Sequence, residues 1–482
     1  MNFDELLALL SSEEPPRIRT DSRLVQSGDV FIAVKGTLHD GHSFINQAVK
    51  NGAKFIVCQS YGPSREPQTA SCEIIIVNDS AKAAATLAQQ SRHNPSSKLT
   101  NLAVTGTNGK TTVAFLTQSV IQNTGQKCGL IGTVLYDTGL AASESSLTTP
   151  DCLDIAEAQY QMLKAGAKYM VIEASSHALS QNRLFAINFK AAAFTNLAGD
   201  HLDYHKTEEH YLAAKSQLFQ ALSPDATAVL NKQSPHAQHI ARKTKAKILW
   251  YAVDEPADIT AHIKSVDINE TVFVLQYASQ EQRINTPLIG QHNVSNHAAA
   301  AGLCLAAGFD LQTIVAGLSA LKTIPGRLEK VQWDGGFAVL VDYAHSDDAL
   351  KNVLSTLKPL CKANLTVVFG CGGDRDRTKR PRMAGVAEKF ADYVIVTSDN
   401  PRTEKPRDII SEIVAGFENP NSENIKVEPD RKKAIELALK NAAKDDIVLI
   451  AGKGHETYQI IGTKKFDFSD KAVALNYLAN RK

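Results

Sequence analysis

The sequence predicts an α/β protein divided into three domains, and three observations carry this prediction. Short apolar segments of strand character alternate with helical segments along the whole chain, as in doubly wound parallel sheets. The length of 482 residues corresponds to about three domains of ~150 residues each. Turn-rich stretches interrupt the alternation near residues 92–97 and 324–329. We therefore expect domains at residues 1–97, 98–325 and 326–482.

Composition and charge exclude several classes of partner. The chain is 43% hydrophobic and 21% charged, as in ordinary globular proteins, and its net charge of +1 offers no broad footprint for nucleic acid. Seven scattered cysteines without a C-x-x-C pair favour reduced thiols over a disulfide framework. No apolar run approaches ~18 residues. We expect a cytoplasmic protein with no membrane anchor.

The first domain has the pattern of a small α/β unit. Its buried-strand candidates lie at residues 30–34, 55–57 and 74–77. Loops at 20–23 and 36–41 are rich in hydrogen-bonding groups, and by themselves they indicate turns.

The strongest single motif lies at residues 104–112, which read VTGTNGKTT between an apolar strand and a helical pattern. Gly106 and Gly109 allow backbone N–H groups to turn towards an anion at a helix N-terminus. Lys110 can reach the β- and γ-phosphates, and the Thr111 hydroxyl can hold Mg²⁺. Val104 stands where the general phosphate-loop pattern has glycine. A helix-capping turn is the alternative, but the full octet in this context favours nucleotide binding.

The rest of the central domain continues as a mainly parallel, doubly wound sheet whose ligands gather at the carboxyl ends of strands. Glu173 ends one strand, where it can face Mg²⁺ or lie beside a helix N-cap, and its position alone does not decide. Residues 200–205 hold two His and two Asp, typical of either a metal or phosphate site or a solvated polar turn. Lys215 lies in a helical segment and has the character of an ordinary surface lysine. Further strands are expected at residues 170–173, 191–195 and 226–230, with an edge hairpin or insertion at 262–290.

The third domain alternates again and has a Rossmann-like pattern, with loops at its strand ends that suit anions. Residues 370–377 resemble a dinucleotide fingerprint only loosely, because the third glycine and a prompt helix are absent, so we reject that site. The Asn-Pro turn at 398–402 holds Arg402 where it can grip a carboxylate, an ordinary loop arginine being the alternative. Residues 451–456 close the last strand in a similar way. Its strands are expected at 337–341, 365–369, 393–397 and 447–450.

In their order along essentially the whole chain, these motifs resemble those of the Mur ligases, the ATP-dependent amide-forming enzymes of peptidoglycan synthesis. The resemblance makes residues 106–112 the family's shortened phosphate loop. Asp347 stands where relatives usually have proline, which alters a helix start that Asp also tolerates. The other motifs are Glu173 to His177, Asn196, Asp200 to His205, Asn293 in HNVSN, Pro325 to Arg327, Asp342 to His345 and Gly452 to Glu456.

Within the family, Asp399 to Arg402 resembles the signature of members that add meso-2,6-diaminopimelate, whereas lysine-adding relatives lack the terminal arginine. Diaminopimelate carries a second amino-acid head where lysine has only an ammonium, so a guanidinium favours the former. The resemblance implies ATP-dependent addition of this amine to the D-Glu γ-carboxylate of UDP-N-acetylmuramoyl-L-alanyl-D-glutamate through an acyl phosphate. It also implies a UDP-sugar-binding first domain.

The resemblance further implies a role for individual residues. Lys110, Glu173, His201 and Lys215 are expected to be catalytic, and Thr111, Glu173, His201 and a carbamate (N6-carboxylysine) on Lys215 to hold Mg²⁺. ATP contacts are expected at Gly106, Thr107, Asn108, Gly109, Lys110, Thr111, Thr112, Asn293, Arg327 and Asp342. The UDP-sugar dipeptide is expected at Thr20, Ser22, Thr37, Leu38, His39, Thr148, Thr149, Ser175, Gln181 and Arg183. Diaminopimelate is expected at Arg375, Asp399, Asn400, Pro401, Arg402, Gly452 and Glu456.

Three alternatives remain open at this point. Two are sister ligases, one adding lysine and one resembling folylpolyglutamate synthase, which lacks a matching first domain and the Asp-Asn-Pro-Arg turn. The third is a phosphate-loop switch without ligation, which would not need Arg375 and Arg402. We expect a monomer whose third domain closes about Pro325 and Gly326 to assemble the site.

Overall fold

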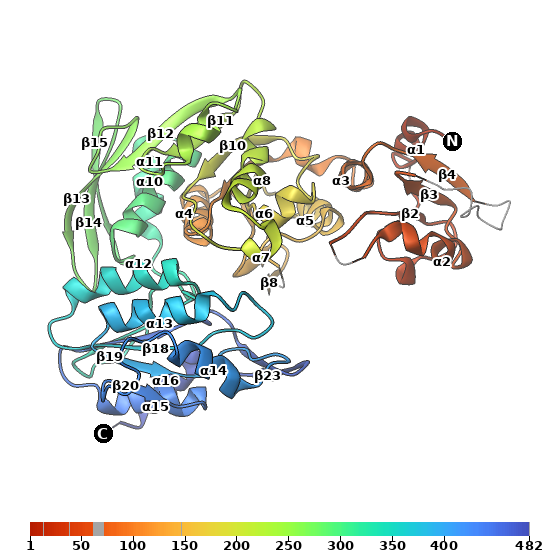
Figure 1. Cartoon of the computed structure of the whole chain (residues 1–482). Coiled ribbons are helices and arrows are strands. Elements are labelled where there is room, and N and C mark those ends of the chain that lie inside the picture. Colours follow the sequence, from red (N-terminus) through yellow and green to blue (C-terminus); the bar gives the residue numbers. More distant parts are fainter. Residues whose placement is uncertain (13, 38, 61–71, 146, 482) are drawn as a thin grey trace.

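The computed structural model describes residues 1–481 except 13, 38, 61–71 and 146. Three main sheets follow one another along the chain, with four, eleven and six strands (Figure 1). The predicted α/β fold class with three sheet-bearing units is confirmed. The residue numbers of the domain boundaries stay predictions. In the part of the chain described here, every helix is too short or too polar to cross a bilayer.

The first sheet is parallel throughout, in the order β1-β2-β3-β4. Its two inner strands are buried along their whole length, because helices cover both faces. Val30 and Ile32 of β2 therefore enter one hydrophobic cluster and Phe31 enters another. The elements are α1 (Phe3–Leu9), β1 (Ile18–Arg19), η1 (Ser22–Leu24), β2 (Val30–Ile32), η2 (Gly41–Phe44), α2 (Ile45–Lys50), β3 (Phe55–Cys58), β4 (Glu73–Ile76), α3 (Ser80–Gln90) and η4 (Pro95–Lys98).

The second sheet runs in the order β15-β14-β13-β12-β11-β10-β5-β9-β6-β7-β8. Strands β13 to β6 in this order are parallel, and antiparallel hairpins extend both edges. The hairpins formed by β13, β14 and β15 confirm the edge structure expected for residues 262–290. The strands are β5 (Thr100–Thr105), β6 (Cys128–Ile131), β7 (Leu135–Asp137), β8 (Ala142–Glu144), β9 (Tyr169–Glu173), β10 (Phe189–Phe194), β11 (Thr227–Asn231), β12 (Lys247–Val253), β13 (Ile259–Val266), β14 (Thr271–Tyr277) and β15 (Gln280–Thr286).

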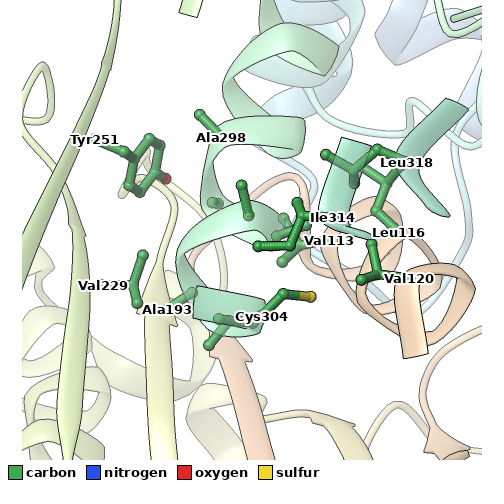
Figure 2. Close-up of a cluster of buried hydrophobic side chains, with 14 of the residues drawn as sticks. Val113, Leu116, Val120, Ala193, Val229, Tyr251, Ala298, Cys304, Ile314 and Leu318 are labelled. Atoms are coloured by element: carbon green, nitrogen blue, oxygen red, sulfur yellow. The ribbon is translucent and has the colours of Figure 1, made fainter. Parts of the chain in front are cut away.

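Helices cover both faces of this sheet. Val113, Leu116 and Val120 of α4 pack with Ile314 and Leu318 of α11 in the buried cluster of Figure 2. This cluster fixes α4 against the sheet, and with it the loop that precedes the helix. The helices are α4 (Lys110–Asn123), α5 (Cys152–Lys164), α6 (Ser176–Ser180), α7 (Leu202–His205), α8 (Glu208–Gln220), α9 (Ala237–Ala241), α10 (Gln291–Ala306) and α11 (Leu311–Ala320).

The third sheet has the order β16-β17-β21-β18-β19-β20, parallel except for the short edge strand β16. A separate hairpin of β22 and β23 stands beside it. The expected strands are confirmed within a residue or two at their ends. The elements are β16 (Glu329–Lys330), β17 (Ala338–Asp342), α12 (Asp347–Leu357), η5 (Lys358–Leu360), β18 (Leu365–Phe369), α13 (Lys379–Phe390), β19 (Tyr393–Val396), α14 (Pro406–Val414), β20 (Ile425–Val427), α15 (Arg431–Asn441), β21 (Ile447–Ala451), β22 (Tyr458–Ile461), β23 (Lys464–Asp467) and α16 (Asp470–Ala479).

Candidate functional site

Three neighbouring strands of the central sheet end at one edge, and each delivers a polar segment there. Strand β5 lies between β9 and β10, with Val104 opposite Glu173 and Thr105 opposite Phe194. The loop 106–109 follows β5, and Thr195 follows β10. The carboxyl ends of parallel strands thus bring together residues that are far apart in the sequence, as expected for ligand sites in doubly wound sheets.

Two glycines make the loop after β5 possible. Gly106 has φ +144° and Gly109 has φ +89°, a region that residues with a Cβ rarely adopt. A Cβ at Gly106 would overlap the Thr195 hydroxyl, and one at Gly109 would overlap the Asn296 side-chain oxygen. The loop therefore lies against its neighbours as bare backbone, which leaves its outer side for a ligand.

Lys110 folds back over this loop. Its Nζ donates to the carbonyls of Gly106 and Thr107 at 3.0 and 2.8 Å. Burial lowers the pKa of Lys110, and the charges of Glu173 and Asp200 oppose that shift. An ammonium that has only carbonyl dipoles as direct partners is available to an incoming phosphate, which binds a cation more strongly than a carbonyl does.

Glu173 is fully buried at the end of β9 and accepts hydrogen bonds from neutral donors. Its Oε2 receives the hydroxyls of Thr111 at 3.1 Å and Thr133 at 3.0 Å, and its Oε1 receives the Thr133 backbone N–H at 2.8 Å. Among the described residues, no lysine, arginine or histidine forms an ion pair with it. A buried carboxylate beside a threonine hydroxyl is an oxygen donor set that fits Mg²⁺.

Lys215 is buried, and the surface position expected for it is wrong. Only 1% of the residue is exposed, and its Nζ donates to the Gly106 carbonyl at 2.8 Å. Lys110 donates to the same oxygen. Burial lowers the pKa of Lys215 well below its ordinary value, and the Lys110 charge adds to this. The Lys215 side chain points inward from α8, and its Nζ bonds a carbonyl of the loop that follows β5. The spacing of residues within the helix does not predict this contact.

The His- and Asp-rich segment 200–205 is partly helical rather than a simple polar turn. His201 has φ +55° and lies 3.6 Å from the Asp200 carboxylate, while His205 is buried and contacts the Ser176 hydroxyl. Burial lowers the pKa of His201 to about 4, with Asp200 opposing. The imidazole is therefore neutral at pH 7, the form that can ligate a metal. Among the described residues, no three His, Cys, Asp or Glu side chains form a preformed metal cluster.

A cavity of about 290 Å³ joins the phosphate loop to the third domain. Arg327 crosses this joint: its guanidinium donates to the Thr111 hydroxyl at 2.9 Å and lies over the ring of Tyr343. Asn108 donates to Asp348 near the start of α12, across the same joint. The cavity is lined by the expected nucleotide residues Thr107 to Thr112, Asn293, Arg327 and Asp342, and by Glu173 and His201. Gly106 and Lys215, which hydrogen-bond each other, are not among the residues that line it.

The residues expected for the dipeptide part of the nucleotide sugar form one hydrogen-bonded group beside Glu173. The Thr149 hydroxyl donates to the Glu173 carbonyl at 2.6 Å, and its oxygen lies 3.0 Å from the Ser175 hydroxyl. Arg183 donates to the Thr149 carbonyl and to the Gln181 side chain. The Thr148 hydroxyl lies 3.0 Å from the Thr133 hydroxyl, which in turn donates to Glu173.

The residues expected for the uridine end lie in the first domain, which extends away from the third domain (Figure 1). Ser22 is buried, and Thr37 and His39 are exposed. Among the described residues, no hydrogen bond joins Thr20, Ser22, Thr37 or His39 to the central domain. Leu38 lies outside the described residues. The structure thus brings together the nucleotide and dipeptide groups, but not the group in the first domain.

The amino-acid residues expected in the third domain gather at the ends of β18, β19 and β21. Arg402 adopts φ +50° and donates to the Gly373 carbonyl at 2.8 Å. Gly452 has φ +115°, and a Cβ there would lie 2.7 Å from the Asp399 carboxylate. Asn400 donates to Glu456 at 2.8 Å. Pro401 is buried within this turn, whereas Arg375 is exposed at its margin.

Thr133 and His455 connect the two halves of the site, and neither was predicted as a site residue. The backbone of Thr133 lies close enough to the His455 ring to oppose the lowering of its pKa, while Thr133 donates to both oxygens of Glu173. Burial, and then the Arg327 charge, lower the pKa of His455 to about 4. His455 belongs to a motif quoted from the sequence, but nothing in the pattern around Thr133 marks it.

These features define a multidomain phosphate-loop protein whose cavity lies at the joint between the second and third sheets, with a polar cluster at the strand ends of the third sheet. Family models match residues 17–92 (Mur ligase family, catalytic domain), 104–304 (Mur ligase middle domain) and 326–454 (Mur ligase, glutamate ligase domain). The chain belongs to the Mur ligase family.

Relatives and solved structures agree over nearly the full length. The UDP-N-acetylmuramoyl-L-alanyl-D-glutamate–2,6-diaminopimelate ligase of Geobacillus kaustophilus (strain HTA426) is 42% identical over 463 residues, covering 95% of this chain and 93% of the relative. The enzyme of that name from Bacillus cereus (strain ATCC 14579) is 40% identical, covering 96% and 94%. A solved structure of a ligase with this name is 34% identical with a TM-score of 0.68, covering 97% and 95%. Folylpolyglutamate synthase from Mycobacterium tuberculosis shares the fold, with 19% identity, a TM-score of 0.64 and coverage of 83% and 95%.

Proposed function

We propose that this chain is an ATP-dependent ligase that joins 2,6-diaminopimelate to the D-Glu γ-carboxylate of UDP-N-acetylmuramoyl-L-alanyl-D-glutamate, a step of peptidoglycan precursor synthesis. One observation carries the proposal. The phosphate loop and the Asp-Asn-Pro-Arg turn, on different sheets, are linked through one short segment: Arg327 donates to Thr111 at 2.9 Å, and Gly326 packs against the loop whose Glu456 accepts from Asn400. The relatives that cover more than nine-tenths of the chain are named for this reaction. Folylpolyglutamate synthase shares only the fold.

The reaction has two steps. The substrate γ-carboxylate attacks the γ-phosphate of ATP to form an acyl phosphate and ADP; the amine of diaminopimelate then attacks the acyl carbon, and inorganic phosphate leaves with a proton lost from nitrogen. Carboxylate and triphosphate repel each other strongly, so cationic groups must lie between them. Lys110 and Arg327 supply that charge from the two sides of the cavity. Residues 106–112 hold the phosphates, and Asn293 and Asp342 orient the remaining nucleotide.

Magnesium, when bound, screens the phosphate charge and orients the reacting oxygens. Thr111 and Glu173 would hold one ion, and Glu173, His201 and a carbamate on Lys215 a second. The geometry supports the carbamate, because two buried ammonium groups that share the Gly106 carbonyl repel each other. Reaction of the neutral Lys215 amine with CO₂ forms a C–N bond, releases one proton and converts this repulsion into attraction. An intact-mass peptide map at neutral pH that shows unmodified Lys215 would contradict this role.

Acceptor choice is assigned to the third domain. Arg402 grips the distal carboxylate of diaminopimelate and Glu456 its distal ammonium, with Arg375, Asp399, Asn400, Pro401 and Gly452 shaping the pocket. L-Lysine offers neither the carboxylate nor the second head, so it leaves Arg402 unpaired. Losing a charged hydrogen-bonded pair costs about 1.5–3 kcal/mol, or ~10- to 150-fold in kcat/KM.

The decisive experiment measures phosphate release with meso-diaminopimelate and with L-lysine. We expect release only when the nucleotide dipeptide and an acceptor are both present, and a strong preference for diaminopimelate. Arg402→Ala should reduce that preference by lowering kcat/KM for diaminopimelate alone. The matched control is Arg407→Ala, because Arg407 is exposed on the neighbouring helix α14. Equal use of both acceptors by the parent would refute the specificity, and acceptor-independent turnover would indicate a phosphate-loop switch.

The remaining roles complete the proposal. Thr20, Ser22 and the loop from Thr37 to His39 would bind the uridine diphosphate, with the central group at Thr148, Thr149, Ser175, Gln181 and Arg183 binding the rest. Free thiols at all seven cysteines support a reducing, cytoplasmic location. We propose a monomer that closes about Gly326. Solution scattering that shows no compaction with an ATP analogue and nucleotide dipeptide would contradict closure.

A further inference from the structure

Lys453 is a fully buried lysine beneath the proposed acceptor pocket, and no role has been assigned to it. It lies two residues after β21, and its side chain has no exposed surface. Its Nζ lies 2.7 Å from Glu456 Oε2 and 3.0 Å from Asn400 Oδ1. An ammonium is rarely buried without such partners, because its desolvation is costly.

The three side chains form a closed hydrogen-bonded triangle. Asn400 Nδ2 donates to Glu456 Oε2 at 2.8 Å, so the same carboxylate oxygen receives both neighbours. Asn400 Oδ1 accepts from Lys453 and from the Ile460 backbone N–H at 2.9 Å. Because Lys453 and the Ile460 N–H are both donors, together they fix which end of the Asn400 amide faces Glu456.

This arrangement occupies one oxygen of Glu456 and leaves the other available. Among the described residues, Oε1 receives no hydrogen bond, while Oε2 receives two. The Glu456 side chain is 15% exposed, so it retains access to the pocket. A carboxylate held by one oxygen cannot rotate freely, which orients its second oxygen before any ligand arrives.

We propose that Lys453 is a positioning residue for acceptor recognition: it fixes Glu456 and Asn400 so that Glu456 Oε1 is aimed at the distal ammonium of the amino-acid acceptor. This inference rests on the proposed function. Lys453 does not touch the acceptor itself. Its compact ammonium suits the role, because three donors on one atom can serve two acceptors at once.

Removing the Lys453 ammonium should weaken acceptor binding more than it changes any other step of the reaction. In Lys453→Met the Glu456 carboxylate loses its ion pair, and Asn400 Oδ1 loses one of its two donors and keeps the Ile460 N–H. Since a hydrogen bond to a charged group contributes about 1.5–3 kcal/mol, KM for diaminopimelate should rise ~10- to 150-fold. KM for ATP should change less than about twofold, because among the described residues no hydrogen bond joins the phosphate loop to these three side chains.

The experiment measures KM and kcat for ATP, nucleotide dipeptide and meso-diaminopimelate in the parent, Lys453→Met and Lys464→Met. Lys464 is the matched control, an exposed lysine on the adjacent hairpin strand β23. Glu456→Gln and the double variant Lys453→Met/Glu456→Gln complete a thermodynamic cycle. The double variant removes both charges together, so it retains a folded third domain even where the single lysine variant unfolds.

We expect Lys453→Met to raise KM for diaminopimelate selectively, and the double variant to match Glu456→Gln within about twofold, because Lys453 acts through Glu456. Unchanged KM for diaminopimelate in Lys453→Met would overturn the inference, as would a double variant in which the two single effects multiply. Equal losses for all three substrates would also overturn it, since they indicate a purely structural lysine. A parent chain that ligates no amino acid would overturn the proposed function as well. If the parent ligates diaminopimelate, the proposed function stands, and the Lys453→Met result then tests the role of Lys453 alone.

Discussion

Gly106→Ala tests whether the loop geometry, rather than its composition, creates the nucleotide site. Gly106 has φ +144°, and a new Cβ would overlap the Thr195 hydroxyl. That hydroxyl donates to the Asn108 carbonyl at 2.6 Å and so braces the loop. In the free variant the loop relaxes away from this conformation, and nucleotide binding must restore it. The strain therefore appears in the Kd for ATP.

The magnitude follows from the two contributions. Forcing a residue with a Cβ into this backbone region costs about 1–2 kcal/mol. Loss of the Thr195 hydrogen bond adds about 1 kcal/mol. The sum of about 2–3 kcal/mol weakens ATP binding ~30- to 140-fold, which calorimetric titration with a non-hydrolysable analogue measures.

The control lies at the other end of the same helix. Gly125 follows α4 with φ +77°, and a Cβ there meets open space. Gly125→Ala should lower the free energy of unfolding by about 1 kcal/mol from backbone strain alone and leave the Kd for ATP unchanged. A Kd for Gly106→Ala within about threefold of the parent would refute the proposed loop geometry.

Three further predictions concern the buried charges. Arg431→Met leaves the fully buried Asp470 carboxylate without its two 2.7 Å hydrogen bonds, and urea unfolding of the third domain should show a loss of about 3–5 kcal/mol. A hydrogen bond from Arg380 lowers the pKa of Glu404 to about 2, so the stability that this carboxylate contributes is complete above its ordinary pKa of 4.5 and is lost as pH falls toward 2. Glu404→Gln should flatten that acid limb of the unfolding free energy. Lys215→Met should lower phosphate release by about 100-fold while the thermal unfolding midpoint stays unchanged or rises, because an apolar side chain replaces a buried polar one.

Features that depend on neighbouring residues were predictable. The phosphate loop was predictable because strand, glycines and helix follow one another directly, and the strand that ends at Glu173 was expected, although its position alone left the role of Glu173 undecided. Parallel topology then places both at one edge, since β5 and β9 are adjacent. The turn at Arg402 was likewise recognisable from Asn-Pro beside a strand.

Features that depend on residues far apart in the sequence were not predictable from it. Lys215 is buried with its Nζ bonded to the Gly106 carbonyl, 109 positions away in the sequence. The spacing of apolar residues in its helix does not indicate that contact. Thr133 matters because it lies between Glu173 and His455 of the third domain. The hairpin of β22 and β23 braces Arg402 through backbone hydrogen bonds, which any sequence in those strands could make.

Arg327 contacts both the phosphate site and the third domain. Its guanidinium donates to Thr111, which itself donates to Glu173, and lies over Tyr343 of the third domain. A ligand that draws the Thr111 hydroxyl away from Glu173 must therefore also change the contacts of Arg327. The adjacent Gly326 packs against Gly454 and His455, the loop that carries Glu456. One short turn, Pro325 to Arg327, thus contacts both the phosphate site and the loop that carries Glu456.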